Sequence, residues 1–334
     1  MVLSKSENKG IRTMSHELEI VNGEAQMAWS GEVPWHGLGT KVSNDLTPEQ
    51  MLQAAGLDWT VHKVPAFANV GGVNINVGHS ALVRTRNDEE DLLDVVSNDW
   101  NPVQNLEAAE FFNDFVMEGD MEMHTAGSLR DGQIVWGLAK VKESFELFKG
   151  DQIDSYLLFS NFHKYGFSTD VRFTPIRVVC NNTLTLSLNS TVERMVKISH
   201  RKVFDASNVK DMLGIATDKL AKYKEMAQFL GSKKAKDEDI VDYFKRVFPV
   251  TGSAENKKKE ISKSAQTALD ILHTQPGAQY AEGTWWQPFN AVTYLTDHLA
   301  GRSADTRLTS AWYGYNKGLK TKALELAVEM AEAA

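Results

Sequence analysis

Cysteine and long apolar runs are what this sequence of 334 residues has least of. Its single cysteine, Cys180, cannot form an internal disulfide and cannot build a cysteine-rich zinc site. No apolar run approaches the roughly 18 residues that are needed to cross a bilayer. The N-terminus also lacks the apolar core of a secretory signal. These absences predict a cytoplasmic protein without a membrane-spanning segment.

Motifs for metals and nucleotides are missing as well. None of the nine histidines stands at the His-x-x-x-His spacing of a helical zinc site, and no Gly-Lys-Ser/Thr loop is present to hold the phosphates of ATP. We therefore expect no cofactor and no catalytic residue, and an enzyme is the least favoured class. One alternative stays open, in which the fold assembles a site from His36, His163 or His200. Cys180 could be its nucleophile, but a small buried side chain is the better interpretation of that residue.

The charge balance differs between the two halves of the chain, although 42% hydrophobic and 24% charged residues are ordinary for a globular protein. Residues 1–150 hold 11 Lys and Arg against 23 Asp and Glu, whereas residues 151–334 hold 25 against 21. Such a contrast is typical of a protein with an acidic face and a second surface that meets nucleic acid. Uneven surface charge without a function is the alternative.

Hydrophobic patterning predicts an α+β fold in two parts. Residues 1–20 are polar and show no periodicity, which indicates a flexible N-terminal arm. Residues 21–204 are predicted to be a core domain with an antiparallel β-sheet and packed helices. Residues 205–334 show helical periodicity and are predicted to form a helical region that packs on the core.

Turn and cap residues locate several of these elements. Thr47-Pro48-Glu49-Gln50 has the residues of a capping box, with proline at the first helical position. Gly71-Gly72 and Asp131-Gly132 mark tight turns between strands. Apolar residues from Leu213 to Leu230 recur at heptad spacing, which predicts a helix that ends at Gly231.

The strand predicted from Phe167 to Val179 is the most informative stretch. Arg172 and Arg177 belong to opposite faces of a regular strand. Pro175 lies between them, however, and proline inside a strand is typical of an edge or a bulge. A one-residue bulge would bring both arginines to one face. An Arg177 that is bonded within the core is the alternative.

Basic residues continue on both sides of this strand. Lys164 lies in the turn before it, and the cap-type residues Asn181, Asn182 and Thr183 predict a helix after it. A groove between sheet and helix that is basic at both rims suits a phosphate backbone. The six candidate phosphate-binding residues are Lys164, Arg172, Arg177, Lys197, Arg201 and Lys202. The aromatic residues that could stack on bases are Tyr165, Phe167 and Trp285.

Several motifs resemble those of one family. The run from Arg177 to Leu184 is similar to the Arg-Val-Val-Cys-x-Asn-Thr-Leu signature of a phage- and plasmid-encoded family, the domain of unknown function 932. The resemblance covers roughly residues 20–330. Further motifs that are similar to this family are Pro34 to Gly39, Trp100 to Asn105, Ile198 to His200, Gly283 to Trp286, Asn290 to Thr293 and Asp297-His298. Arg201 stands where the family often has threonine. The family's setting in mobile DNA implies DNA metabolism inside a host cell.

Two hypotheses about function follow. The first is a protein that binds single-stranded DNA, promotes annealing or recombination and works as a homo-oligomer. It depends on the basic residues and on an analogy of fold with annealing recombinases that form rings on single-stranded DNA. The alternative is an interaction protein that inhibits or modulates a host system, with its acidic surface against a host protein. Neither hypothesis needs a catalytic residue.

Overall fold

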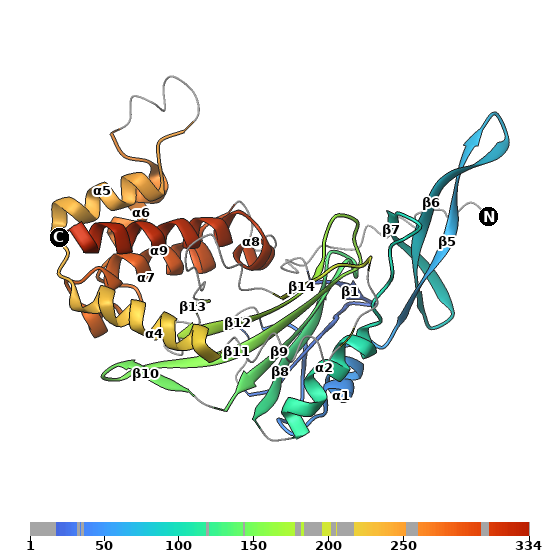
Figure 1. Cartoon of the computed structure of the whole chain (residues 1–334), viewed down its shortest axis with the longest axis horizontal. Helices are drawn as coiled ribbons and strands as arrows, with labels where there is room; N and C mark the ends of the chain where they lie inside the picture. Colours follow the sequence, from blue (N-terminus) through green and yellow to red (C-terminus); the bar gives the residue numbers. More distant parts are fainter. Residues whose placement is uncertain are drawn as a thin grey trace.

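The fold is known from a computed structural model that describes residues 18–31, 34, 37–117, 120–142, 144–177, 182–183, 196–201, 205, 217–251, 260–301 and 307–333. These residues form a large, mostly antiparallel sheet, a separate three-stranded sheet and a set of helices (Figure 1). The predicted α+β class is confirmed. Among the described helices, none is long and apolar enough to cross a membrane.

The strands are β1 Ile20–Val21, β2 Glu24–Ala25, β3 Met27–Trp29, β4 Thr40–Lys41, β5 Thr60–Val70, β6 Val73–Arg86, β7 Glu89–Val96, β8 Met121–Leu129, β9 Ile134–Val141, β10 Phe145–Phe148, β11 Asp151–Phe162, β12 Thr169–Arg177, β13 Asn182–Thr183 and β14 Val196–Ile198. The helices are α1 Pro48–Ala54, α2 Asn105–Met117, α4 Thr217–Ser232, α5 Asp237–Val247, α6 Lys263–Ile271, α7 Trp286–Tyr294, α8 Arg307–Tyr313 and α9 Tyr315–Ala333, with a 3-10 turn at Ala278–Ala281 and a π-helical turn at Leu295–Leu299.

The large sheet has the order β13-β12-β11-β9-β8-β3-β4, with β10 on β11 and β14 on β12. Helix α2 packs its Phe112 against Phe159 on one face. Helix α8 packs its Trp312 against Trp136 on the other face. Because both faces are covered, the central strand β11 is buried along almost its whole length.

Local sequence signals are confirmed where the turn or cap chemistry is strong. Thr47 and Gln50 form the reciprocal capping box at α1. Gly71 and Gly72 have φ of 58° and 85° in the turn between β5 and β6. Such positive φ values are what a two-residue hairpin turn requires. The Asp131-Gly132 turn joins β8 to β9 as predicted.

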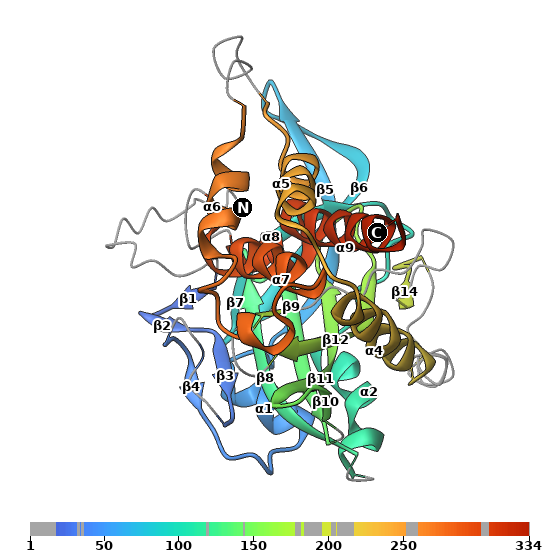
Figure 2. The same cartoon turned by 90° about the vertical axis from the view of Figure 1, so that its left-hand side faces the viewer.

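The helical region packs on the end of the large sheet through Leu147 and Ile153 (Figures 1 and 2). The predicted helix that carries the heptad pattern is α4, and its described seam residues Tyr223 and Leu230 are buried. Gly231 does not end this helix, which continues to Ser232. The physical reason for the glycine is a close approach, because a Cβ atom there would lie 2.2 Å from Cζ of Phe148.

Two predictions about the central strand and the N-terminus are wrong. Strands β11 and β12 pair without a register shift, with Ser155 opposite Pro175, so no bulge unites the two arginines. Asn182 and Thr183 pair with β12 as strand β13, and the helix predicted after them lies outside the described residues. The N-terminal arm cannot extend to residue 20, because Leu18 and Glu19 are buried and the amide of Glu19 donates to the Ser128 carbonyl.

Candidate nucleic-acid interface

The turn between β11 and β12 presents aromatic side chains to solvent. Tyr165 is 53% exposed and Phe167 is 44% exposed. The Tyr165 amide donates to a carboxylate oxygen of Asp94 at 2.8 Å, and the Phe167 ring stacks on Phe162 with centroids 5.1 Å apart. Both aromatic residues are therefore held by the fold, yet each keeps an open ring surface on which a base can stack.

Strand β14 brings two of the predicted basic residues beside this turn. Its pairing places Ile198 opposite Thr169, the first residue of β12, and Lys197 opposite Asp170. Lys197 is exposed. The Arg201 side chain, just beyond the strand, is 74% exposed and lies 3.5 Å from the Asp99 carboxylate. The edge of the large sheet thus carries cations next to the aromatic turn.

Lys63 is a further cation at this corner, and sequence reasoning missed it. Its ammonium group donates to the Asn98 carbonyl at 2.8 Å. The pKa of Asp99 is lowered by a hydrogen bond from Ser97, by its own backbone amide and by the charges of Arg201 and Lys63. Lys63 and Arg201 therefore lie around the same carboxylate. Sequence reasoning gave no signal for Lys63, because it stands more than 130 positions from Arg201 in the sequence.

We define the basic–aromatic corner as Lys63, Lys164, Tyr165, Phe167, Lys197 and Arg201. Lys164 is half-buried and donates to the side-chain oxygen of Gln133 at 3.2 Å. Four other residues of the sequence prediction are described only in part or not at all. The Arg177 backbone pairs with Ile153 and Asn182, while its side chain and the whole of Lys202 lie outside the described residues, as do His36 and Cys180.

Below the corner, a buried polar network joins motifs that are far apart in the sequence. The Asn101 amide donates to the His200 carbonyl at 2.6 Å, and the His200 ring stacks on Trp100 with centroids 4.1 Å apart. The Thr169 hydroxyl donates to the side-chain oxygen of Asn161 at 3.1 Å and lies 3.5 Å from Nε2 of His200. The network ties the start of α2 to the edge strand β14 and so fixes the backbone from which Arg201 projects.

His163 is the deepest member of this network. Its Nε2 lies 3.0 Å from the Asn105 side-chain oxygen, a contact that a proton on Nε2 satisfies. Burial lowers the pKa of His163 to about 3, and burial also lowers the pKa of His200. Both rings are neutral at pH 7. Among the described residues, the hydrogen-bond partners of the two rings are amides, a hydroxyl and a backbone carbonyl, and none of them is a carboxylate.

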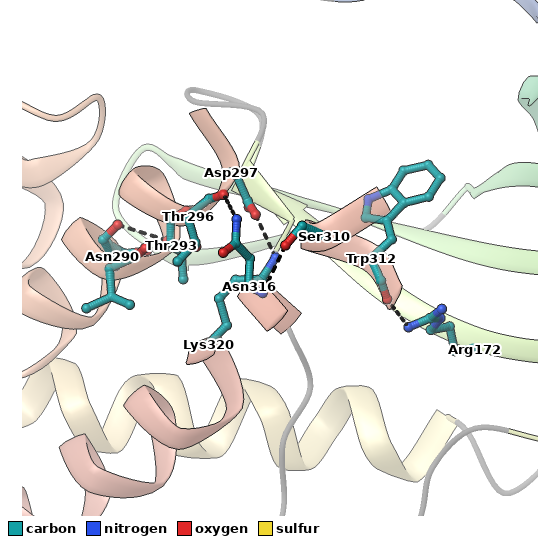
Figure 3. A network of polar contacts seen from close by, with 10 residues as sticks. Arg172, Asn290, Thr293, Thr296, Asp297, Ser310, Trp312, Asn316 and Lys320 are labelled. Atoms are coloured by element: carbon teal, nitrogen blue, oxygen red, sulfur yellow. Dashed lines mark hydrogen bonds and ion pairs between the residues drawn. The ribbon is translucent and has the colours of Figure 1, made fainter. Parts of the chain in front are cut away.

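Arg172 lies inside the molecule, between the sheet and α8. Its side chain is 13% exposed and forms an ion pair with Asp170 at 3.3 Å. One guanidinium nitrogen donates to the Trp312 carbonyl at 2.9 Å, as Figure 3 shows, and the group lies 5.0 Å from the Tyr313 ring centroid. Burial raises the pKa of Asp170, and the charge of Arg172 opposes this rise. This geometry gives Arg172 a structural role in holding α8, and its phosphate contact stays a prediction.

Trp285 cannot stack on a base as predicted, because it is 1% exposed. Its ring packs on Tyr243 within the helical core, with centroids 5.8 Å apart. The paired tryptophans of the Gly283 to Trp286 motif are both buried, so this motif acts in packing. Sequence reasoning could not separate a buried tryptophan from an exposed one, since the surrounding residues are mixed in polarity.

A second polar network lies in the helical region, and the sequence did not predict it. Lys320 on α9 is completely buried and donates to Asp297 at 2.7 Å (Figure 3). The Asn316 side chain donates to the Thr296 carbonyl at 2.8 Å, within the π-helical turn, and the Asn316 amide donates to the Ser310 hydroxyl. Thr296, Ser310 and Asn316 line one side of a cavity of about 280 Å³. The Asp297-His298 motif thus supplies the counter-ion of a buried lysine.

The fold and the corner define a class, an α+β protein whose sheet edge combines exposed cations with exposed aromatic rings. Within that class the chain is placed by its sequence. The family model for a domain of unknown function (DUF932) matches residues 92–312, more than half of the chain, and the protein belongs to this family. The matched range includes the whole corner except Lys63. No curated protein matches the chain, and no solved structure does.

Proposed function

We propose that this protein binds single-stranded DNA at the basic–aromatic corner and promotes annealing or recombination. The observation that carries the proposal is the exposed pair Tyr165 and Phe167, with Lys164 in the same turn and with Lys197 and Arg201 on the adjoining edge strand. Cations neutralise a phosphate backbone, and aromatic faces accept bases of any sequence. No bond is made or broken, so no catalytic residue is needed.

A single strand is a better ligand for this corner than a duplex. Bases inside a duplex are already stacked on one another, so the open rings of Tyr165 and Phe167 have no partner there. The carboxylates of Asp94 and Asp99 lie beside the corner, against Tyr165 and Arg201. These carboxylates repel phosphates and so weaken binding to the outside of a duplex. Base stacking therefore contributes a larger share of the affinity for a single strand.

The aromatic part of the proposal is tested with Tyr165→Ala. We expect this change to weaken binding of a fluorescent oligo-dT by about tenfold, because one base–aromatic stack contributes roughly 1–3 kcal/mol. The control is Tyr315→Ala, which removes another exposed tyrosine at the start of α9. Fluorescence anisotropy at low salt gives the affinities. Equal affinities for the two variants, or no binding by the unchanged protein, would overturn the proposal.

The cationic part is tested by the salt dependence of the same binding. We expect Lys197→Ala and Arg201→Ala each to reduce the slope of log affinity against log salt by about 0.7, the contribution of one phosphate contact on a single strand. Lys149→Ala is the control, since Lys149 is exposed in the turn between β10 and β11 at the other end of the sheet. A slope that Lys149→Ala alters as much as Arg201→Ala would contradict the assignment of the corner.

A further inference from the structure

The hairpin of β5 and β6 extends away from the rest of the molecule (Figure 1). Beyond its base it carries no charge, since residues 64–83 contain no Asp, Glu, Lys or Arg in a chain with 24% charged residues. Every residue from 64 to 79 is exposed or half-buried. A surface segment of this length without charge is unusual, because charged side chains normally keep exposed strands apart.

Strand register places most of the exposed apolar side chains on one side of the three-stranded sheet. Val70 pairs with Val73 and Ala68 pairs with Ile75, so these residues share a face. Val64 lies on the same side of β5 as Ala68 and Val70, since it is an even number of positions away. Ala81 pairs with both Val64 and Val95, which carries the same face across to β7.

We define the apolar face as Val64, Val70, Val73, Ile75, Leu92 and Val95; Leu92 belongs to it because it pairs with Val83, which lies on the same side of β6 as Ala81. Their exposed fractions run from 37% for Val64 to 63% for Val73. The opposite face of the hairpin is more polar: Asn69 pairs with Asn74 there and their side chains hydrogen-bond at 2.8 Å, although Phe67, opposite Asn76, is exposed on it as well. The hairpin is thus amphipathic, like a strand pair that covers a core, but its apolar side faces outward.

We propose that the apolar face is the contact between two copies of this chain, packed face to face about a two-fold axis. A sheet that is apolar on one face is stable when a second layer covers that face. The covering surface must itself be uncharged and apolar, and the same face of a second copy meets this condition. A two-fold axis makes such a contact self-complementary and closes it at two copies.

The available area is sufficient for such a contact. Six half-exposed aliphatic side chains with the intervening alanines and backbone bury on the order of 500 Å² per copy, if each side chain contributes ~60–80 Å². Two copies then bury on the order of 1,000 Å², the lower limit of a specific interface. This contact is independent of the proposed DNA binding, because no residue of the basic–aromatic corner belongs to the apolar face.

The test compares two neighbouring residues of β6 that face opposite sides. Ile75→Lys places a charge within the apolar face, and Asn74→Lys places the same charge on the polar face. Both positions are exposed, so neither change disturbs a buried core. Sedimentation equilibrium of the full-length protein gives the mass and the dissociation constant. Circular dichroism verifies that each variant is folded.

We expect a dimer for the unchanged protein and for Asn74→Lys. For Ile75→Lys we expect a dissociation constant that is raised at least tenfold, because a buried unpaired ammonium group opposes association. A monomer at all concentrations would overturn the proposal, and residues 1–17 or another partner would then be the occupant of the face. If the protein is a dimer and Ile75→Lys leaves its dissociation constant unchanged, the proposal is overturned as well, because the two copies then meet through another surface.

Discussion

At the scale of single residues, burial decides the chemistry of the polar side chains in this protein. His163 and His200 were candidates for a catalytic site, but burial lowers the pKa of both imidazoles and keeps them neutral. Arg172 was a candidate for phosphate binding, and its guanidinium group is enclosed by Asp170, the Trp312 carbonyl and the Tyr313 ring. Tyr165, Phe167, Lys197 and Arg201 remain at the surface and are available to a ligand.

The buried imidazole of His163 makes stability depend on pH. Its pKa is about 3 in the folded protein, against an ordinary value of 6.5. Below pH 6.5 the unfolded chain takes up a proton that the folded chain does not. Stability is therefore complete above pH 6.5 and is lost as the pH falls towards 3. One such group contributes about 1.4 kcal/mol per pH unit in this window.

The variant His163→Gln tests this dependence, because glutamine keeps an amide donor for Asn105 and does not titrate. We expect the free energy of unfolding to fall less steeply between pH 6.5 and 5.0 for the variant, with a difference of about 2 kcal/mol over this range at most. Urea unfolding at the two pH values gives the comparison. Parallel pH dependence of the two proteins would show that His163 is protonated in the fold.

At the scale of elements, two glycines inside helices differ in their surroundings. A Cβ atom at Gly231 of α4 would lie 2.2 Å from the Phe148 ring, whereas a Cβ atom at Gly318 of α9 would meet nothing within 4 Å. Glycine lowers helix stability relative to alanine in both cases. Only Gly231 offsets this loss of helix stability, because it lets α4 approach strand β10 closely.

Alanine substitution separates these two positions. We expect Gly318→Ala to raise the free energy of unfolding by roughly 0.5–1 kcal/mol, the difference in helix propensity. We expect Gly231→Ala to lower it by about 1–3 kcal/mol, because the Phe148 ring must move from its packed position against Trp286. Urea unfolding measures both changes. A stabilising Gly231→Ala would mean that the aromatic ring moves at no cost and that the contact is loose.

The elements were predictable from sequence where a few neighbouring residues determine them. Thr47 and Gln50 form their capping box within one helical turn, and Gly71 and Gly72 supply the positive φ of a tight turn by themselves. Pro175 misled the prediction, because proline in a strand is typical of a bulge but here takes part in an uninterrupted register. Which alternative holds depends on the partner strand, and a single sequence does not contain that information.

The candidate site was only partly predictable for the same reason. Tyr165 and Arg201 lie in polar loops, so their exposure could be inferred from their neighbours. Trp285 and Lys320 are buried by helices that come from elsewhere in the chain. Lys63 joins the corner through β5, far from the other cations in the sequence. Long-range packing determines these three positions, and sequence patterns report mainly on short-range structure.

At the scale of the whole molecule, Glu19 joins the two sheets. Its backbone amide bonds to Ser128 on β8 of the large sheet, while its carboxylate pairs with Arg84 at 2.6 Å and with Arg86 at 3.1 Å, both on β6. The Glu19 side chain is 4% exposed, and that of Arg84 is 6% exposed. This buried ion pair sets how the three-stranded sheet, and the apolar face with it, is attached to the body of the protein.

Glu19→Gln tests this connection. We expect a loss of about 3 kcal/mol in the free energy of unfolding, because the buried Arg84 guanidinium group loses one of the two carboxylates that pair with it. Amide hydrogen exchange in residues 60–96 should accelerate as well. Glu329→Gln is the control: its ion pair with Arg246 is exposed, and we expect a change below about 1 kcal/mol. Equal effects of the two changes would mean that Glu19 does not hold the sheets together.

The absence of charge from the hairpin has a consequence for proteolysis. Trypsin cleaves after lysine and arginine, and the chain has such residues at Lys63 and Arg84 with none between them. Digestion of the unfolded chain therefore releases the entire projecting part of the hairpin as one peptide, residues 64–84. Mass spectrometry of this one peptide therefore reports any chemical label on the exposed side chains of the projecting part of the hairpin.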